Sequence, residues 1–411
     1  MTQTLWRRLG AGCILGAGFL FIAAAITLGL ANTKPGGKDF IEYWAVEQAL
    51  VKHANPYDGA TLLRLEKAEG FDKDRPEFWY SPPPALALAL PLGLLSAKTG
   101  LIAWTLLHFS CLSLSLWLLW VLHGRPDTLL HLLGYLFAPV VLCFEAGQIS
   151  IFFLLSIALF LFLVRRSLTF WAGVALFPCI LKPHLFLVFA LALVLWIIHR
   201  KAYGIVAGFA AAFFAACAVP VMLDPPIWSQ YQRMMGAGDM MNEYVATLSV
   251  SMRFVVDRHA IWIQFIPAAT GGVWAIWYFA TRRKDWDWMN HGLLVLLVSV
   301  MCAPYGWFFD ESVILPAILT AVLRARKNGR PFWPIVLVAG AALIEVYEGI
   351  DVMSPFFLWS TPAWLACYLY ASKAGDNSYP AANRVEPSMV NRGDEGNEPH
   401  SSLSRRALTI R

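Results

Sequence analysis

Two carboxyl groups stand three residues apart in the segment 38–44, at Asp39 and Glu42, beside the phenol of Tyr43. A positioned carboxylate can take a proton from an attacking hydroxyl group, and such general-base catalysis contributes about 10²–10⁴-fold to a rate. Asp39 also precedes a helix-like stretch, 40–52, so its other reading is an N-cap that accepts bonds from the first-turn amides. The two roles are compatible, because a capping carboxylate is rigidly held.

Cations interrupt the apolar sequence further along the chain. Lys182 and His184 stand between two apolar runs, where a buried charge is costly and usually functional. The alternatives are a lysine whose long stem carries its ammonium group to a polar surface and a histidine that is only a polar interface residue. Arg253 lies in a second polar segment, which also contains Asn242.

Aromatic and polar residues mark four further segments. Residues 55–58 form a turn by composition, the segment 78–84 ends in three prolines, and Gln148 stands at a predicted helix end. The segment 303–311, which contains Trp307 and Asp310, breaks a helix. The aromatic side chains there are also typical of a membrane-interface belt.

The elements that must position these residues are predicted to be membrane-spanning helices. Apolar residues make up 58% of the 411-residue chain and charged residues only 14%, whereas a soluble domain carries roughly a quarter. A run of about 20 apolar residues crosses the ~30 Å hydrocarbon layer as a helix with its backbone groups internally bonded. The sequence therefore predicts an all-α polytopic membrane protein, with spans at about 9–31, 100–122, 128–144, 148–164, 168–181, 184–199, 203–222, 261–281, 287–304, 309–325, 332–349 and 355–372.

Loop charge orients these twelve helices. If the short apolar stretch 82–95 lies in the interface or re-enters the membrane, pairs such as Arg165-Arg166 and Arg282-Arg283 face the cytoplasm, as the positive-inside rule requires. Both termini are then cytoplasmic in a multi-pass plasma (inner) membrane protein. Two long loops, about 32–99 and 224–260, lie outside and carry most of the polar candidates.

The predicted domain organisation is simple. Residues 1–373 form one transmembrane domain, and residues 374–411, which are poor in apolar side chains, form a disordered cytoplasmic tail. The seven cysteines lie within or beside apolar runs and are interpreted as packing residues. The sequence offers no clear metal-ligand set, and we expect no metal and no cofactor. The formal net charge of +5 follows from the cytoplasmic loops, so no nucleic-acid partner is expected.

Four landmarks in order carry a resemblance to a known family. They are Asp39-Phe40-x-x-Tyr43 with Asn55-Pro56-Tyr57-Asp58, Tyr80-Ser81-Pro82-Pro83, Gly147-Gln148 with Lys182-Pro183, and Pro304-x-x-Trp307. This set resembles glycosyltransferase family 87, the polyprenyl-phosphate-mannose-dependent α-mannosyltransferases of the GT-C superfamily. The resemblance covers about residues 39–316.

The resemblance implies a GT-C-like helical bundle in which the long first outer loop carries amphipathic helices. It implies inverting transfer of a sugar, mannose by the family's name, from a polyprenyl-phosphate donor to a glycolipid or glycan acceptor on the outer face. Asp39 occupies the place of the catalytic base. Cations that hold the leaving phosphate would be Lys182, Arg253 and His184. Substrate-binding residues would be Glu42, Tyr43, Tyr57, Asp58, Tyr80, Gln148, Asn242, Trp307 and Asp310.

One departure and one alternative accompany this interpretation. Family members commonly carry a histidine just after the tryptophan of the fourth landmark, where this chain has Phe308 and Phe309. The alternative function is a transporter or lipid flippase without bond chemistry. A transporter often carries charged residues deep in its spans, whereas the ionisable residues here gather at outer helix ends and in the two long loops. The sequence therefore favours surface chemistry.

Overall fold

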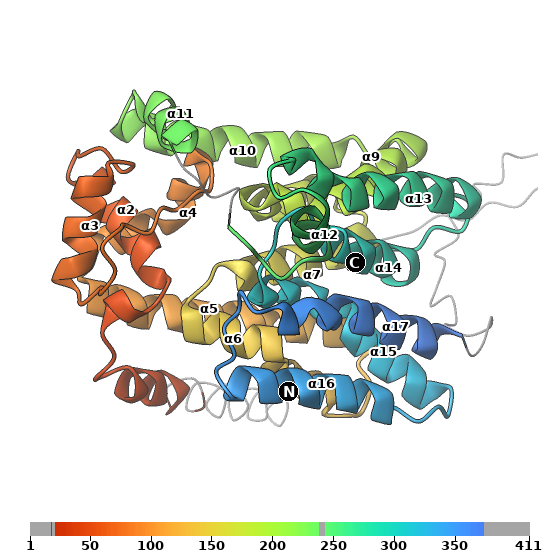
Figure 1. Cartoon of the computed structure of the whole chain (residues 1–411). Helices are drawn as coiled ribbons and strands as arrows, with labels where there is room; N and C mark the ends of the chain where they lie inside the picture. The colour runs from red at the N-terminus through yellow and green to blue at the C-terminus, as the bar shows by residue number, and fades with distance from the viewer. Residues whose placement is uncertain (1–17, 19–20, 238–242, 374–411) are drawn as a thin grey trace, which may run out of the picture. The chain divides into compact units, whose positions relative to one another are not determined.

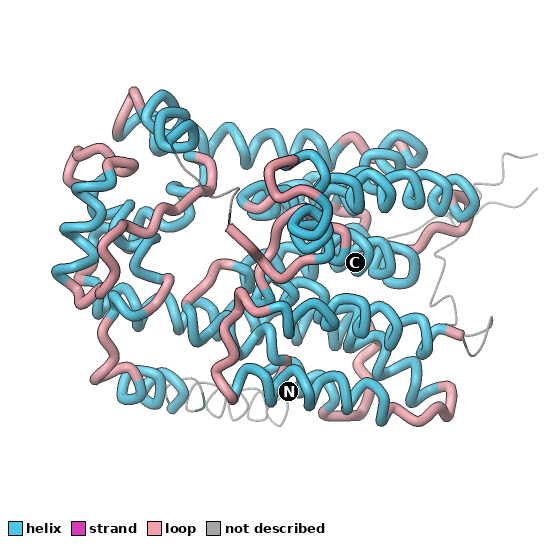
Figure 2. The backbone as a smooth tube through the Cα atoms, viewed as in Figure 1, coloured by secondary structure: helices cyan, strands magenta, loops and turns pink. Residues whose placement is uncertain are grey.

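The computed structural model describes residues 18, 21–237 and 243–373 (Figure 1). Within these ranges every regular element is a helix, joined by loops and turns (Figure 2), in agreement with the predicted all-α class. Residues 9–17, 19 and 20 of the predicted first span, 9–31, and the whole predicted tail, 374–411, lie outside the described residues.

The α-helices are joined by short 3₁₀ segments and one π turn. The α-helices are α2 (Phe40–Val51), α3 (Gly59–Ala68), α4 (Leu86–Ala89), α5 (Ala97–Leu122), α6 (Ala138–Ala146), α7 (Ser150–Arg165), α8 (Thr169–Leu176), α9 (Leu187–Arg200), α10 (Gly204–Leu223), α11 (Ile227–Ala237), α12 (Leu248–Val256), α13 (Ile266–Arg282), α14 (Leu293–Met301), α15 (Leu315–Lys327), α16 (Trp333–Tyr347) and α17 (Ser360–Ser372). The short segments are η1 (Pro35–Gly37), η2 (Pro83–Ala85), η3 (Leu90–Leu94), η4 (Leu130–Leu136), η5 (Phe177–Leu181), η6 (Pro183–Phe186), η8 (Ile261–Phe265), the π turn η9 (Trp288–Gly292), η10 (Phe308–Ile314) and η11 (Pro355–Trp359).

The predicted spans from 100–122 onward all coincide with helices, many of them one 3₁₀ segment followed or preceded by one α-helix. Proline explains many of these divisions, because its missing amide and fixed φ suit the first turn of a helix and not the interior. Pro316, for example, stands in the first turn of α15, directly after η10. Within the part of the chain that the structure describes, three helices, Ala97–Leu122, Pro183–Arg200 and Gly204–Leu223, are long and apolar enough to cross a membrane. The number of crossings and their orientation stay predictions.

The surface of α10 shows why a membrane suits this chain. Its side chains are almost all apolar, yet Phe214 and Met222 expose 68% and 82% of their surface. Leaving a contiguous apolar helix face in water would be unfavourable. In the hydrocarbon layer of a membrane this exposed apolar surface carries no such cost. The fold is therefore that of a membrane protein.

The first long loop folds into helices that pack between α5 and α10. Figure 1 shows α2, α3 and α4 together at one end of these two long helices. The stretch 82–95 is broken into η2, α4 and η3. It is held to α2 by Gln48 Nε2, which donates to Gly93 O over 2.7 Å. Glycine is required at Gly93, because a Cβ there would lie 2.5 Å from the carbonyl oxygen of Glu47.

Candidate functional site

One cavity of about 810 Å³ collects side chains from segments that are far apart in the sequence. Its wall combines the start of α2, the strip 77–82, the turn between α6 and α7, the junction of η5 and η6, and the loop before η10. Its lining includes eight predicted site residues, Asp39, Glu42, Tyr43, Tyr80, Gln148, Lys182, His184 and Trp307.

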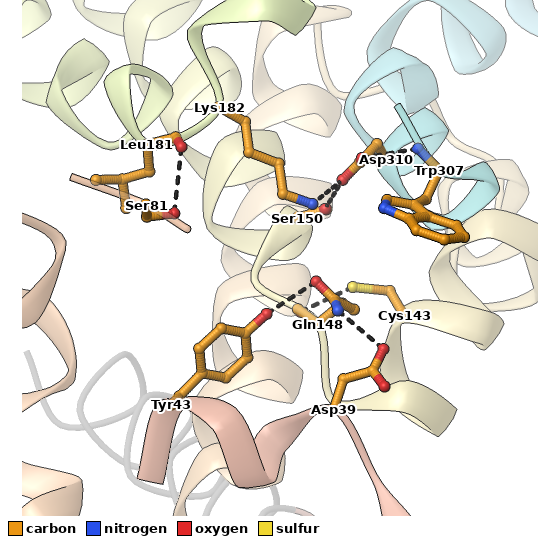
Figure 3. A network of polar contacts seen from close by, with 10 residues as sticks. All are labelled: Asp39, Tyr43, Ser81, Cys143, Gln148, Ser150, Leu181, Lys182, Trp307 and Asp310. Carbon is orange, nitrogen blue, oxygen red and sulfur yellow. Dashed lines mark hydrogen bonds and ion pairs between the residues drawn. The ribbon is translucent and has the colours of Figure 1, made fainter. Parts of the chain in front are cut away.

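Asp39 stands at the N-terminal boundary of α2, but its side chain does not cap the helix. The N-cap interpretation was therefore wrong for the carboxylate. The backbone explains this, because Asp39 has helical φ and ψ of −59° and −20°, whereas a capping residue typically lies in the extended region. Its Oδ2 instead accepts a hydrogen bond of 2.9 Å from Gln148 Nε2 (Figure 3).

Gln148 is held in one orientation by its neighbours. Its Oε1 accepts a 2.8 Å hydrogen bond from the hydroxyl of Tyr43, which leaves Nε2 to donate to Asp39. The preceding residue, Gly147, has φ +81°, a conformation that side chains disfavour, and its carbonyl accepts from Trp104 Nε1 over 2.7 Å. A Cβ on Gly147 would also lie 2.9 Å from the Cβ of Phe40.

The carboxyl groups of Asp39 and Glu42 share one poorly hydrated environment. Burial raises the pKa of Asp39, and the hydrogen bond from Gln148 opposes that rise. Burial, followed by the charge of Asp39, raises the pKa of Glu42 well above its usual value. Two neighbouring carboxylates also repel each other, so the charge of either one disfavours ionisation of the other.

A second network holds Lys182 (Figure 3). Its Nζ lies 2.7 Å from Asp310 Oδ1, an oxygen that also accepts from Ser150 Oγ. The other oxygen, Oδ2, accepts from the backbone amide of Trp307 over 3.0 Å. Asp310 is 1% exposed and Lys182 15%. The ammonium group is therefore fixed at the cavity wall by a buried counter-ion, and it has three donors to share.

The turn between α6 and α7 joins the two networks. Gln148 binds Asp39, and Ser150, two residues later, binds Asp310. A change in this turn would move both the acidic and the basic side of the cavity.

Comparison with known proteins decides the class. The family model of glycosyltransferase family 87 matches residues 78–304, which is more than half of the chain. This chain belongs to glycosyltransferase family 87. No curated protein and no solved structure matches it.

The chain is thus a family 87 membrane glycosyltransferase. The family match, residues 78–304, includes Gln148, Lys182 and His184, whereas Trp307 follows its end and Asp39 lies well before its start. Sugar transfer needs bond chemistry, so membership counts against a transporter or flippase that performs none.

Four predicted site residues that the structure describes, Tyr57, Asp58, Arg253 and Asp310, are not in the lining of the large cavity. Tyr57 and Asp58 line a second, smaller cavity. The side chain of Arg253 on α12 is fully buried, with its guanidinium group 5.1 Å from the ring centroid of Phe254, and it is not part of the large cavity's lining. Asn242 lies outside the described residues. Asp310 is not in the lining itself but binds Lys182, which is.

The sequence missed several charged and polar residues of the lining, namely Lys73, Glu77, Glu243, Gln264 and Asp351. Four of them stand in loops and Gln264 stands in η8, and no local pattern separates them from solvated surface residues. Their role follows only from the packing of distant segments. Among the described residues, no group of three or more His, Cys, Asp or Glu side chains is placed to hold a metal ion.

Proposed function

We propose that this glycosyltransferase moves a sugar from a polyprenyl-phosphate donor to a hydroxyl group of a glycolipid or glycan on the outer face of the membrane. The observation that carries the proposal is the shared cavity, which combines a half-buried carboxylate, Asp39, with a fixed ammonium group, Lys182. Sugar transfer from a phosphate requires a carboxylate that takes the proton of the acceptor and a cation that stabilises the leaving phosphate.

Asp39 serves as the base in this proposal. The acceptor oxygen bonds to the anomeric carbon, its proton passes to Asp39, and the sugar–phosphate bond breaks with both electrons going to phosphate. A single displacement of this kind inverts the anomeric configuration. The raised pKa of Asp39 makes its carboxylate a better proton acceptor, because catalytic efficiency grows as the pKa of a base approaches the working pH.

In this proposal Lys182 stabilises the negative charge that develops on the leaving phosphate. Its position is set by Asp310 before any ligand arrives, and preorganised charges stabilise a developing anion most effectively. His184 lines the cavity beside it. Arg253 does not line the cavity, so the proposal does not depend on it. Of the two phenylalanines that follow Trp307 in place of the family's histidine, Phe309 lines the cavity, and its ring stacks on Trp307 with centroids 6.0 Å apart.

An isoprenoid donor also fits the rest of the wall. Ile180, Leu181, Phe265, Val352 and Met353 give the cavity an apolar side, and apolar surface favours a hydrocarbon chain. We propose mannose as the sugar, on the strength of the family resemblance.

The experiment is a transfer assay with the purified chain in lipid nanodiscs, using radiolabelled polyprenyl-phosphate mannose and the corresponding glucose and arabinose donors. We expect release of polyprenyl phosphate and a product of inverted anomeric configuration from the mannose donor. Transfer from another donor would correct the sugar, and retained configuration would contradict the single displacement. No transfer from any polyprenyl-phosphate sugar would overturn the proposal.

A further inference from the structure

One face of α12 packs against the protein, and the opposite face carries exposed apolar side chains. The inner face contains three buried residues, Ser249, Val250 and Arg253. On the other face Leu248 is exposed, and Val255 and Val256 expose 85% and 67% of their surface. Their spacing of seven and eight residues places these three side chains on one stripe of the helix. A helix at a water surface has polar side chains outward, so this face of α12 is not suited to water.

The exposed apolar surface continues beyond α12, which packs against η8 and α13. Both elements add exposed apolar side chains, namely Ile261, Trp262 and Phe265 in η8 and Val273, Ile276 and Trp277 in α13. Helix α13 belongs to the predicted span 261–281, so we expect its exposed side chains to face hydrocarbon. The apolar stripe of α12 therefore adjoins a surface whose partner is lipid.

Helix α12 lies crosswise to its neighbours. Figure 1 shows α12 nearly end-on, whereas α10 and α13 run across the view. Helices that span a bilayer run close to its normal, so a helix crosswise to them lies close to the membrane plane. Amphipathic helices take this orientation when their apolar face enters the boundary between headgroups and acyl chains, to a depth of about 5–10 Å.

The turn between α12 and η8 supplies polar groups beside this apolar surface. Asp257, Arg258 and His259 are exposed. Oδ1 of Asp257 accepts a 2.9 Å hydrogen bond from the amide of His259, which holds the turn. Trp262 follows the turn and is 66% exposed, and tryptophan is enriched at membrane–water interfaces. The polar turn suits hydrated headgroups, and the tryptophan suits the boundary next to them.

We propose that the α12–η8 segment, residues 248–265, docks on the membrane itself and lies in the headgroup region of the leaflet on which the large cavity opens. Its apolar stripe faces the acyl chains. Gln264 and Phe265 also line the large cavity, so the segment holds one wall of that cavity at the level of the headgroups. A lipid-linked donor carries its phosphate at this level, and that consequence alone rests on the proposed function.

The test measures depth with nitroxide spin labels on the full chain in lipid nanodiscs, in a background without native cysteines. Labels at Val256→Cys and Trp262→Cys should collide several-fold more often with oxygen, which concentrates in lipid, than with the water-soluble nickel(II)–EDDA complex. Two control positions calibrate the scale. Arg64→Cys, on an exposed position of α3, should favour the nickel complex, and Val273→Cys, on the exposed face of α13, should favour oxygen.

A second measurement keeps the native cysteines. Trp262→Gln replaces an apolar ring at the interface with a polar amide, so its melting temperature in nanodiscs should fall by a few degrees. Trp262→Phe keeps an aromatic ring and should recover most of that loss. An exposed tryptophan in water would give no such difference between the two variants.

Preferential collision of both labels with the nickel complex would place the α12–η8 segment in water and overturn the proposal. Low collision rates with both reagents would show that protein covers the stripe, from this chain or a second copy, and would overturn it as well. Lipid exposure of both labels in a chain that transfers no sugar would instead remove the proposed function and leave the membrane docking standing.

Discussion

Asp39 presents its two carboxylate oxygens to different surroundings. Oδ2 is held by Gln148, while the hydrogen bonds among described residues leave Oδ1 open to the cavity. Tyr43 fixes which end of the Gln148 amide faces the carboxylate. The family resemblance alone predicted a substrate-binding role for Gln148, whereas these bonds support a positioning role.

Gln148→Leu should shift the acid limb of the kcat/KM profile to higher pH. Without the amide donor, the ionised form of Asp39 loses a bond that lowers its pKa. Hydrogen bonds to charged groups contribute about 1.5–3 kcal/mol, so kcat/KM on the acid side should fall by about tenfold or more. The charges of Glu77, Lys73 and Lys182 also act on Asp39, and they are unchanged in this variant.

Tyr43→Phe is the matched control, because it keeps the amide but frees its orientation. It should shift the profile in the same direction by less. A Gln148→Leu enzyme with a higher KM and an unmoved acid limb would identify Gln148 as a substrate ligand instead.

At the scale of elements, hydropathy and proline positions could predict where the helices lie. The predicted helix 40–52 corresponds to α2 (Phe40–Val51), and the predicted span 203–222 corresponds to α10 (Gly204–Leu223). The break of the stretch 82–95 into three short helices depends on its packing against α2, which no local pattern contains. The position of the segment 72–77 also depends on packing, because the amide of its last residue, Glu77, donates to a buried carboxyl group of α3.

That carboxyl group belongs to Glu66, which has no exposed surface. Its Oε2 accepts from the amide of Glu77 over 3.3 Å, and within the described residues its Oε1 has no partner. Burial, the largest influence, raises the pKa of Glu66 to about 7. The folded state therefore binds this proton more tightly than the unfolded state, and stability that is present below about pH 4.5 is lost as pH rises to about 7.

Glu66→Gln should consequently raise the melting temperature by a few degrees at pH 8 and change it little at pH 4. Differential scanning fluorimetry at both pH values measures this. Glu69→Gln, which changes a partly exposed carboxyl group after the same helix, serves as the control. An equal gain for Glu66→Gln at both pH values would show that its effect does not come from the carboxyl charge.

At the scale of the whole molecule, the sequence could predict the membrane class and the family, because both depend on hydropathy and on short landmarks. The site itself could be predicted only in part. Asp39 and Gln148 are 109 positions apart, and Lys182 and Asp310 are 128 apart. No periodicity indicates such pairings. The placement of Tyr57 and Asp58 in a separate cavity likewise follows from the position of α11.

Topology is the whole-molecule prediction. Loop charge places the first long loop outside and the loop at Arg283 in the cytoplasm. In a background without native cysteines, Asp74→Cys, at a side chain that is 97% exposed, should react with a membrane-impermeant maleimide in intact cells. Arg283→Cys should react only after the membrane is permeabilised. Labelling of position 283 in intact cells would invert the orientation and move the cavity to the other face.

The central claim, that Asp39 is the catalytic base, is tested most directly by the turnover of Asp39→Asn beside Glu42→Gln. The asparagine side chain keeps an oxygen that can accept from Gln148, and the change removes a carboxylate that burial disfavours, so the variant should fold and melt no lower than the wild type at neutral pH. Its turnover should fall by roughly two orders of magnitude or more, and Glu42→Gln should lose less. Normal turnover by a folded Asp39→Asn enzyme, above all beside an inactive Glu42→Gln, would contradict the account.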